Sequence, residues 1–117
     1  MNHYHTSTGE RVTQGQIDAR LKKSYRQNES DYVCQSRGVN CQTSPCDHDH
    51  SISQKRCKEL HKAELIYDPE NWVISCRACH SEHESWKSGL NQLHKNYTKR
   101  MEYMKKHDPE GYRARED

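Results

Sequence analysis

Phenylalanine is absent from the sequence, and apolar residues of every kind are scarce. Of its 117 residues 30% are hydrophobic and 31% are charged, and the mean hydropathy is −1.38. No stretch approaches the roughly 20 apolar residues of a membrane-spanning helix, and residues 1–11 lack the apolar run of a secretory signal. We therefore expect one small domain without membrane contact, whose thin core needs a metal, disulfides or a partner.

Cysteine and histidine are abundant by contrast, with six and nine residues. Cytosolic thiols stay reduced, so without an export signal the cysteines are predicted to bind a metal in a cytoplasmic protein. The alternative is a secreted domain held together by disulfides. A structural zinc ion can supply most of the folding energy of a chain so poor in apolar residues, which makes the metal the stronger expectation.

The net charge of +2 hides an uneven distribution of charge along the chain. Acidic residues outnumber basic ones between residues 46 and 84, a segment that is also rich in histidine. The flanking basic residues that are predicted to contact DNA phosphates are Arg20, Lys22, Lys23, Arg26, Lys95, Lys99 and Arg100. Basic arms around an acidic centre suit a polyanion held over a metal, and two solvated helix faces are the alternative.

The pattern of apolar and turn residues predicts a small α+β domain over 13–108 with a core of 32–90. Thr13 and Gln16 match a capping box at the start of a basic helix, and Asp108, which precedes a proline, is expected to end the last helix. The predicted elements are a disordered leader over 1–12, helices over 13–27, 77–90 and 91–107, strands over 32–34, 46–53 and 72–74, a partly helical loop over 54–66, and a tail over 109–117.

The cysteines predict one structural zinc site. Cys76 and Cys79 form a C-x-x-C motif between a predicted strand and a predicted helix, so both thiolates can face one tetrahedral ion. Cys34 and Cys41 enclose a glycine and form the second pair. Cys46 is an alternative to Cys41, whereas Cys57 has no predicted role. A redox pair or buried free thiols are the remaining interpretation of these residues.

A second constellation predicts a catalytic metal site. Asp47 and His48 are adjacent, so in a strand they point to opposite faces, and one can bind a metal while the other faces a substrate. His80 and Glu84 lie one turn apart on the predicted helix. Together Asp47, His80 and Glu84 offer the oxygen and nitrogen ligands that suit Mg²⁺, Mn²⁺ or another divalent ion. Two alternatives remain open. His83 can replace Glu84 as a metal ligand, and Asp49 and His50 can take the places of Asp47 and His48.

With Asn71 and the run from Cys76 to His80, this pattern resembles the HNH endonucleases, also called His-Me finger or ββα-metal nucleases, over about residues 32–86. The resemblance implies a zinc-stabilised, treble-clef-like ββα finger between basic helices. It also implies that His48 deprotonates the attacking water, and that Asp47 and His80 hold the divalent ion. Asn71 would orient the hairpin or ligate the metal. Imidazole titrates at about pH 6.5, which suits a general base at neutral pH.

The expected function is therefore metal-dependent hydrolysis of phosphodiester bonds, preferentially in double-stranded DNA, by a monomer or a homodimer. Small proteins that resemble this one are often encoded by phages, which would place the chain in the cytoplasm of a bacterial host. The alternative function is a non-catalytic treble-clef zinc module that binds nucleic acid or protein. Such a module would keep the cysteines and the basic helices but would not need Asp47, His48 or Asn71.

Overall fold

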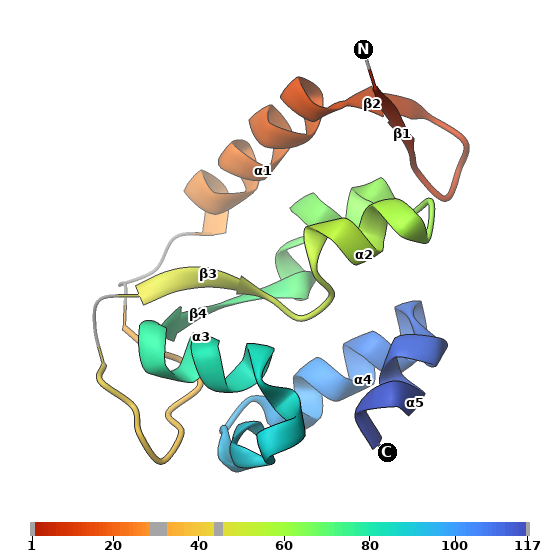
Figure 1. Cartoon of the computed structure of the whole chain (residues 1–117). Helices are drawn as coiled ribbons and strands as arrows, with labels where there is room; N and C mark the ends of the chain where they lie inside the picture. The colour runs from red at the N-terminus through yellow and green to blue at the C-terminus, as the bar shows by residue number, and fades with distance from the viewer. Residues whose placement is uncertain (1, 29–32, 44–45, 117) are drawn as a thin grey trace. The chain divides into compact units, whose positions relative to one another are not determined.

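The computed structural model describes residues 2–28, 33–43 and 46–116 (Figure 1). Within them the fold is α+β, with two sheets of two strands each and five α-helices. The contacts divide the chain into two compact units, of which the first comprises Met1–Glu29 and Ile52–Asn71 and the second Ser30–Ser51 and Trp72–Asp117. Each unit therefore has its own set of packed elements.

The first unit begins with a hairpin where the sequence predicted a disordered leader. Strand β1 (His3–His5) pairs antiparallel with β2 (Arg11–Thr13). The turn between them is held by the Glu10 amide, which donates to Thr6 Oγ1 at 3.1 Å, and by Gly9, whose φ of 88° suits only glycine well. The fully buried Val12 anchors the hairpin in the unit, so the expectation of a leader without structure was wrong.

Helix α1 (Gln14–Asn28) starts at the predicted capping box. The Thr13 amide donates to Gln16 Oε1 at 2.8 Å, and the Gln16 amide donates to Thr13 Oγ1 at 3.2 Å. The helix buries Ile17 and Leu21, which lie four residues apart on one face. These side chains belong to the core of this unit. The rest of the core comes from Ile52, from Cys57 of helix α2 (Gln54–Glu59), and from Ala63, Leu65 and Ile66 of the 3-10 helix Ala63–Tyr67. A second 3-10 helix, Pro69–Asn71, ends the unit.

The second unit is built on a β-hairpin followed by a helix. Strand β3 (Cys46–His50) pairs antiparallel with β4 (Trp72–Cys76), with His48 opposite Ile74, as the two predicted strands require. Helix α3 (Arg77–Glu84) follows β4 directly. The strand predicted over 32–34 is not formed at Val33 and Cys34, and Tyr32 lies outside the described residues.

Three helix boundaries of the second unit differ from the predictions. Helix α3 ends at Glu84 rather than residue 90, and the chain continues through the 3-10 helices Trp86–Ser88 and Leu90–Leu93 around Gly89, whose φ is 82°. As a result α4 (Tyr97–His107) begins later than expected, although it ends at Asp108 as predicted. The predicted tail instead forms α5 (Pro109–Glu116). Asp108 Oδ1 accepts the Gly111 amide at 3.1 Å and so caps this helix, which begins with a proline.

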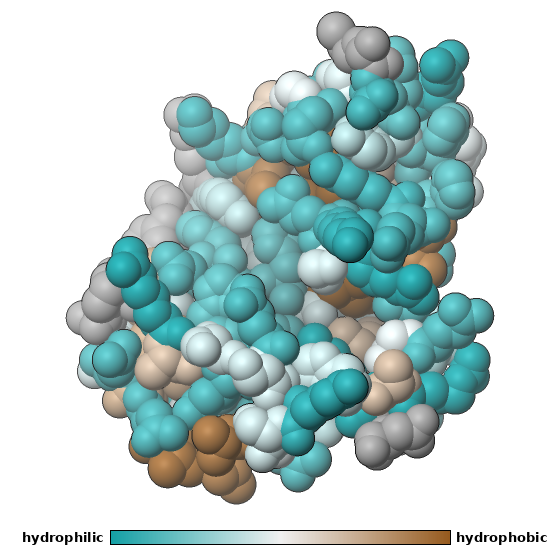
Figure 2. All heavy atoms as spheres, in the orientation of Figure 1, coloured by the Kyte–Doolittle hydropathy of each residue, from teal (hydrophilic) through white to brown (hydrophobic). Residues whose placement is uncertain are grey.

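The face of the molecule drawn in Figure 2 is largely hydrophilic. The exposed large apolar side chains among the described residues are Val33, Val39, Leu90 and Leu93. No helix in the described part of the chain is long and apolar enough to cross a membrane.

Candidate functional site

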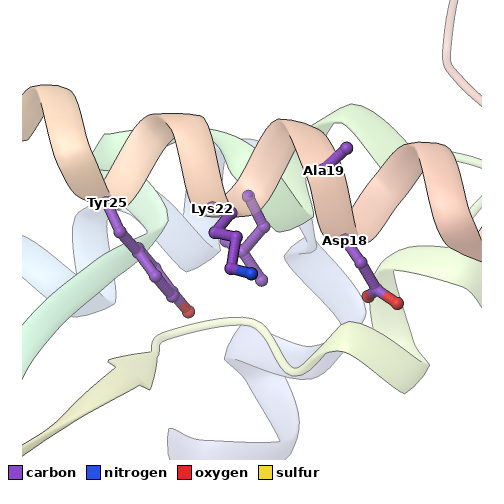
Figure 3. Close-up of a pocket in the computed structure, with 5 residues that line it drawn as sticks. Asp18, Ala19, Lys22 and Tyr25 are labelled. Carbon is purple, nitrogen blue, oxygen red and sulfur yellow. The ribbon is translucent and has the colours of Figure 1, made fainter.

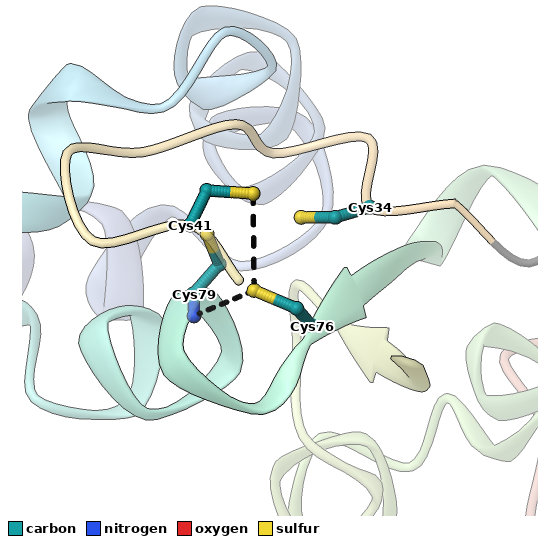
Figure 4. A group of neighbouring side chains, drawn as sticks. All are labelled: Cys34, Cys41, Cys76 and Cys79. Carbon is teal, nitrogen blue, oxygen red and sulfur yellow. Dashed lines mark hydrogen bonds between the residues drawn. The ribbon is translucent and has the colours of Figure 1, made fainter. Parts of the chain in front are cut away.

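Four cysteines converge in the second unit, as the sequence predicted (Figure 4). Cys34 and Cys41 come from the loop over 33–43, Cys76 ends β4, and Cys79 lies in the first turn of α3. Their four sulfur atoms lie within 4.8 Å of one another, and the Sγ atoms of Cys41 and Cys76 are 4.0 Å apart. A tetrahedral zinc ion with Zn–S bonds of about 2.3 Å requires sulfur separations of about 3.8 Å. The cluster can therefore hold a metal ion such as zinc with little adjustment.

Backbone amides donate hydrogen bonds to three of the four sulfur atoms. The Gly38 amide lies 3.4 Å from Cys79 Sγ, and the Gln42 amide lies 3.3 Å from Cys76 Sγ. Cys76 is also the N-cap of α3, where its sulfur accepts the Cys79 amide. Burial raises the pKa of Cys76, but these amide bonds outweigh it and lower the pKa to about 7. Amides aimed at sulfur stabilise the thiolate form, which is the form that binds a metal.

The two cysteines outside this group have other environments. Cys46, the predicted alternative to Cys41, packs beside the cluster, but its thiol donates to the Thr43 carbonyl at 3.0 Å. Cys57 is buried in the first unit, where its thiol lies 3.6 Å from the Ile52 carbonyl. No disulfide links the described cysteines. The structural zinc site expected from the sequence therefore has one complete set of four ligands.

The acidic side chains of the predicted catalytic site gather around His80 of α3. Its Nδ1 lies 3.5 Å from Asp47 Oδ2, and its Nε2 lies 3.1 Å from Glu84 Oε1 and 3.7 Å from Asp49 Oδ1. Asp47 and Asp49 alternate along β3, so both side chains leave the same face of the hairpin. Carboxylates of β3 and of α3 thus lie close to the imidazole of His80.

The set formed by Asp47, His80 and Glu84 is not assembled around one point. Asp47 lies at one ring nitrogen of His80 and Glu84 at the other, and an imidazole binds a given ion through only one of them. Among the described residues, the groups of three or more whose donor atoms all lie within 4.8 Å of one another are the four cysteines and the set of Cys79, Glu82 and His94. A divalent ion shared by the predicted trio thus requires a side-chain rotation.

Asp49 is held by an arginine that the sequence assigned to another role. Arg100 of α4 donates from Nη1 to Asp49 Oδ2 at 3.0 Å and from Nη2 to Oδ1 at 3.1 Å, while its Nε donates to Ser51 Oγ at 2.9 Å. The two side chains are only 4% and 1% exposed. Burial would raise the pKa of Asp49, but the Arg100 charge and its hydrogen bonds lower it. Arg100 was expected to contact DNA, and its burial in this ion pair corrects that expectation.

The two other histidines of the predicted site differ in their surroundings. The ring of His48 meets that of Trp72 edge to face, with the centroids 4.8 Å apart, on the side of β3 opposite to Asp47. His83, the alternative to Glu84, is buried, and its Nε2 lies 3.5 Å from Arg115 Nη2. Burial, reinforced by the Arg100 and Arg115 charges, lowers the pKa of His83 to about 3. His83 therefore stays neutral and inside the unit, whereas Asp47 and Glu84 face solvent.

Asn71, the third named residue of the resemblance, is fully buried in the first unit. Its Oδ1 accepts the Ile52 amide at 2.8 Å, and its Nδ2 donates to the Ile52 carbonyl at 3.0 Å and to the Leu65 carbonyl at 2.9 Å. One amide side chain thus closes the segment from Ile52 to Leu65 by three hydrogen bonds.

The predicted phosphate-binding residues other than Arg100 lie on the two helical regions. Lys22, Lys23, Lys95 and Lys99 are exposed, Arg20 pairs with Glu10 at 3.0 Å, and the side chain of Arg26 lies outside the described part. Lys22 points to the same side of α1 as Asp18 and Tyr25, along a hollow of about 430 Å³ whose described lining comes from this helix (Figure 3). The charge of α1 is therefore mixed on this side rather than uniformly basic.

Comparisons of the chain with protein-family models, with curated proteins and with solved structures give no match.

Proposed function

We propose that the chain is a metal-dependent endonuclease of the HNH type that hydrolyses phosphodiester bonds in DNA. The observation that carries the proposal is the approach of Asp47 on β3 to His80 on α3, at 3.5 Å, beside a four-cysteine cluster that joins the hairpin to the same helix. A hairpin followed by a helix, with an acidic strand residue facing a helix histidine, is the arrangement that the resemblance implies. The donor types also fit a divalent ion.

Each side chain of the proposed site has a distinct task. Asp47 and His80 would hold the divalent ion, and Asp47 suits this better than Asp49 because its side chain is 42% exposed whereas both oxygens of Asp49 bond to Arg100. When bound, the ion would polarise the scissile phosphate and offset the charge of the leaving oxygen. His48, on the other face of β3, would take the proton of the attacking water at a ring nitrogen.

Arg77 is a further candidate for the substrate side of the proposed site. Its side chain is 72% exposed, and its Nε lies 4.0 Å from Asp47 Oδ2. A guanidinium at this position can donate two parallel hydrogen bonds to a phosphate (bidentate binding) beside the ion. The exposed lysines of α1 and α4 would add contacts to the DNA backbone that depend strongly on salt and carry little sequence information.

The test is plasmid nicking by the full chain with Mg²⁺ or Mn²⁺ added. We expect wild-type protein to nick DNA, and His48→Ala to lose at least about 100-fold in rate, the order that loss of general-base catalysis gives. Asp47→Asn and His80→Ala should also lose activity, because each removes a ligand of the divalent ion. His107→Ala, on α4 and away from the proposed site, serves as the matched control and should retain activity. Loss of activity in the control, or full activity in His48→Ala, would contradict the assignment.

The alternative, a zinc module that binds nucleic acid or protein without catalysis, is supported by one observation. The four cysteine sulfur atoms all lie within 4.8 Å of one another, whereas the donor atoms of Asp47, His80 and Glu84 do not form such a group. If DNA stays intact over a range of metals and salt concentrations while zinc remains bound, this module is the function and the nuclease proposal fails. Binding of labelled duplex DNA by the same protein would then identify nucleic acid as its ligand.

A further inference from the structure

A buried ion pair lies against the four-cysteine cluster and has no part in the proposed catalysis. His94 Nε2 lies 2.9 Å from Glu82 Oε1, and both residues are about as buried as the cysteines, at 5% and 8% exposed. A donor atom from each lies within 4.8 Å of Cys79 Sγ. Glu82 comes from α3, one turn after Cys79, and His94 follows the 3-10 helix that leads to α4.

Glu82 and His94 bond to each other and to the loop over 33–43 in this arrangement. His94 Nε2 and Glu82 Oε1 share one hydrogen bond, and Glu82 Oε2 accepts a second from Asn40 Nδ2. Burial raises the pKa of Glu82, but the bonds from His94 and Asn40 lower it, which favours the carboxylate form that accepts both. The pair therefore contacts the four-cysteine cluster from outside its four ligands.

Gly38 is the residue through which the pair reaches the cluster. A Cβ at this position would lie 2.5 Å from His94 Cδ2 and 2.9 Å from Glu82 Oε1, so only glycine fits between the pair and the sulfur atoms. The Gly38 amide donates to Cys79 Sγ at 3.4 Å. Two residues later, Asn40 donates from Nδ2 to Glu82 Oε2 at 2.9 Å. The pair thus lies against the loop at Gly38, whose amide points at Cys79 Sγ, and again at Asn40.

We propose that Glu82 and His94 form a brace that positions the Gly38 amide on Cys79 Sγ and thereby sets the zinc affinity of the four-cysteine cluster. The brace is a set of positioning residues, because neither side chain ligates the metal. Outer groups that orient metal ligands typically change metal affinity by about 10–100-fold when they are removed. The inference concerns the structural site alone and does not depend on nuclease activity.

The test measures zinc affinity of the full chain by competition with a chromogenic chelator. We expect His94→Ala to bind zinc about 10–100-fold more weakly, and His94→Gln, whose amide can still donate to Glu82, to recover most of the loss. Glu102→Gln, a matched change at an exposed position of α4, should bind as wild type does. Affinity within threefold of wild type in His94→Ala, or equal losses in His94→Ala and His94→Gln, would overturn the proposal.

A second readout separates positioning of the sulfur from loss of fold. The full chain is loaded with Co²⁺ in place of zinc, and the thiolate-to-cobalt charge-transfer band is recorded for wild type and for His94→Gln, Glu82→Gln and Glu102→Gln. Loss of the amide bond to Cys79 Sγ makes the thiolate a better electron donor, so Glu82→Gln should shift the band to longer wavelength while the other two variants keep its position. An unshifted band in Glu82→Gln would show that the pair supports only the fold, and the proposal would fail.

Discussion

Removing the guanidinium of Arg100 should destabilise the second unit severely, because it leaves a buried carboxylate without a cation. Arg100 makes two bonds to the Asp49 carboxylate, one to the Asp49 carbonyl at 3.2 Å and one to Ser51. With side-chain exposures of 4% and 1%, water replaces none of them. Breaking one partner of a buried pair costs about 3–5 kcal/mol, so we expect a loss of that size in Arg100→Leu at pH 7.

Two companion variants show whether the cost comes from the unpaired charge. Asp49→Asn combined with Arg100→Leu should be more stable than Arg100→Leu alone, because the buried charge is gone. Arg100→Lys keeps the charge but not the planar fork, and should lose about 1.5–3 kcal/mol, the contribution of one hydrogen bond to a charged group. This smaller loss keeps the test usable if Arg100→Leu does not fold.

The pH dependence of the difference follows from the direction of the Asp49 pKa. In the wild type, burial raises the pKa of Asp49, but Arg100 lowers it by more, so the folded-state pKa lies below the unfolded value of about 3.9. The carboxylate therefore stabilises the fold above the unfolded pKa, and this contribution is lost as the pH falls through the folded value. In Arg100→Leu the burial of Asp49, which raises the pKa, is no longer opposed by the arginine. The difference in stability between the two proteins should therefore be largest near pH 7 and shrink on acidification, as the variant takes up its proton first.

The assay is urea unfolding followed by tryptophan fluorescence, with zinc at a fixed excess. Arg113→Leu, an exposed arginine on α5, is the matched control and should stay within about 0.5 kcal/mol of wild type. The reasoning is refuted if Arg100→Leu also stays within that margin, or if the double variant with Asp49→Asn is no more stable than the single one.

Three further changes test other parts of the structure, two by urea unfolding and one by zinc binding. Thr13→Ala removes one half of the capping box and should cost about 1 kcal/mol, with no change in zinc binding. Asn71→Ala leaves the Ile52 amide and two carbonyls without their partner, which should cost at least about 1–3 kcal/mol, the penalty for one such group. Gly38→Ala places a Cβ 2.5 Å from the His94 ring, so zinc binding to the full chain should weaken, as chelator competition measures.

Local chemistry in the sequence predicted several elements well. The capping box of Thr13 and Gln16 depends on residues three apart, and both of its hydrogen bonds form. The strand from Trp72 and the C-x-x-C after it are likewise set by neighbouring residues. The grouping of Cys34 and Cys41 with that motif rested on metal chemistry, which restricts the partners of a thiolate more tightly than apolar packing does.

The predictions that failed concern residues whose structural role depends on which other residues they contact. Asp108 and its proline were interpreted as the end of a helix, but the same pair is also a good start, because aspartate caps and proline fits the first turn. Arg100 was counted as surface charge although it lies one helical turn before Met104, which is also buried in α4. Helical spacing was the signal that could have placed it inside the unit.

The chain compensates for its few apolar residues in different ways in its two units. The first unit packs a small aliphatic core around Ile17, Ile52 and Ile66. The interior of the second unit instead contains three sets of interacting polar groups: the four cysteines, the pair of Glu82 with His94, and the pair of Asp49 with Arg100. An apolar core loses stability gradually as methyl groups are removed, whereas a buried polar contact is either complete or costly. The second unit should therefore respond to loss of one cysteine of the cluster, or of one buried charge, far more abruptly than the first unit responds to a trimmed isoleucine.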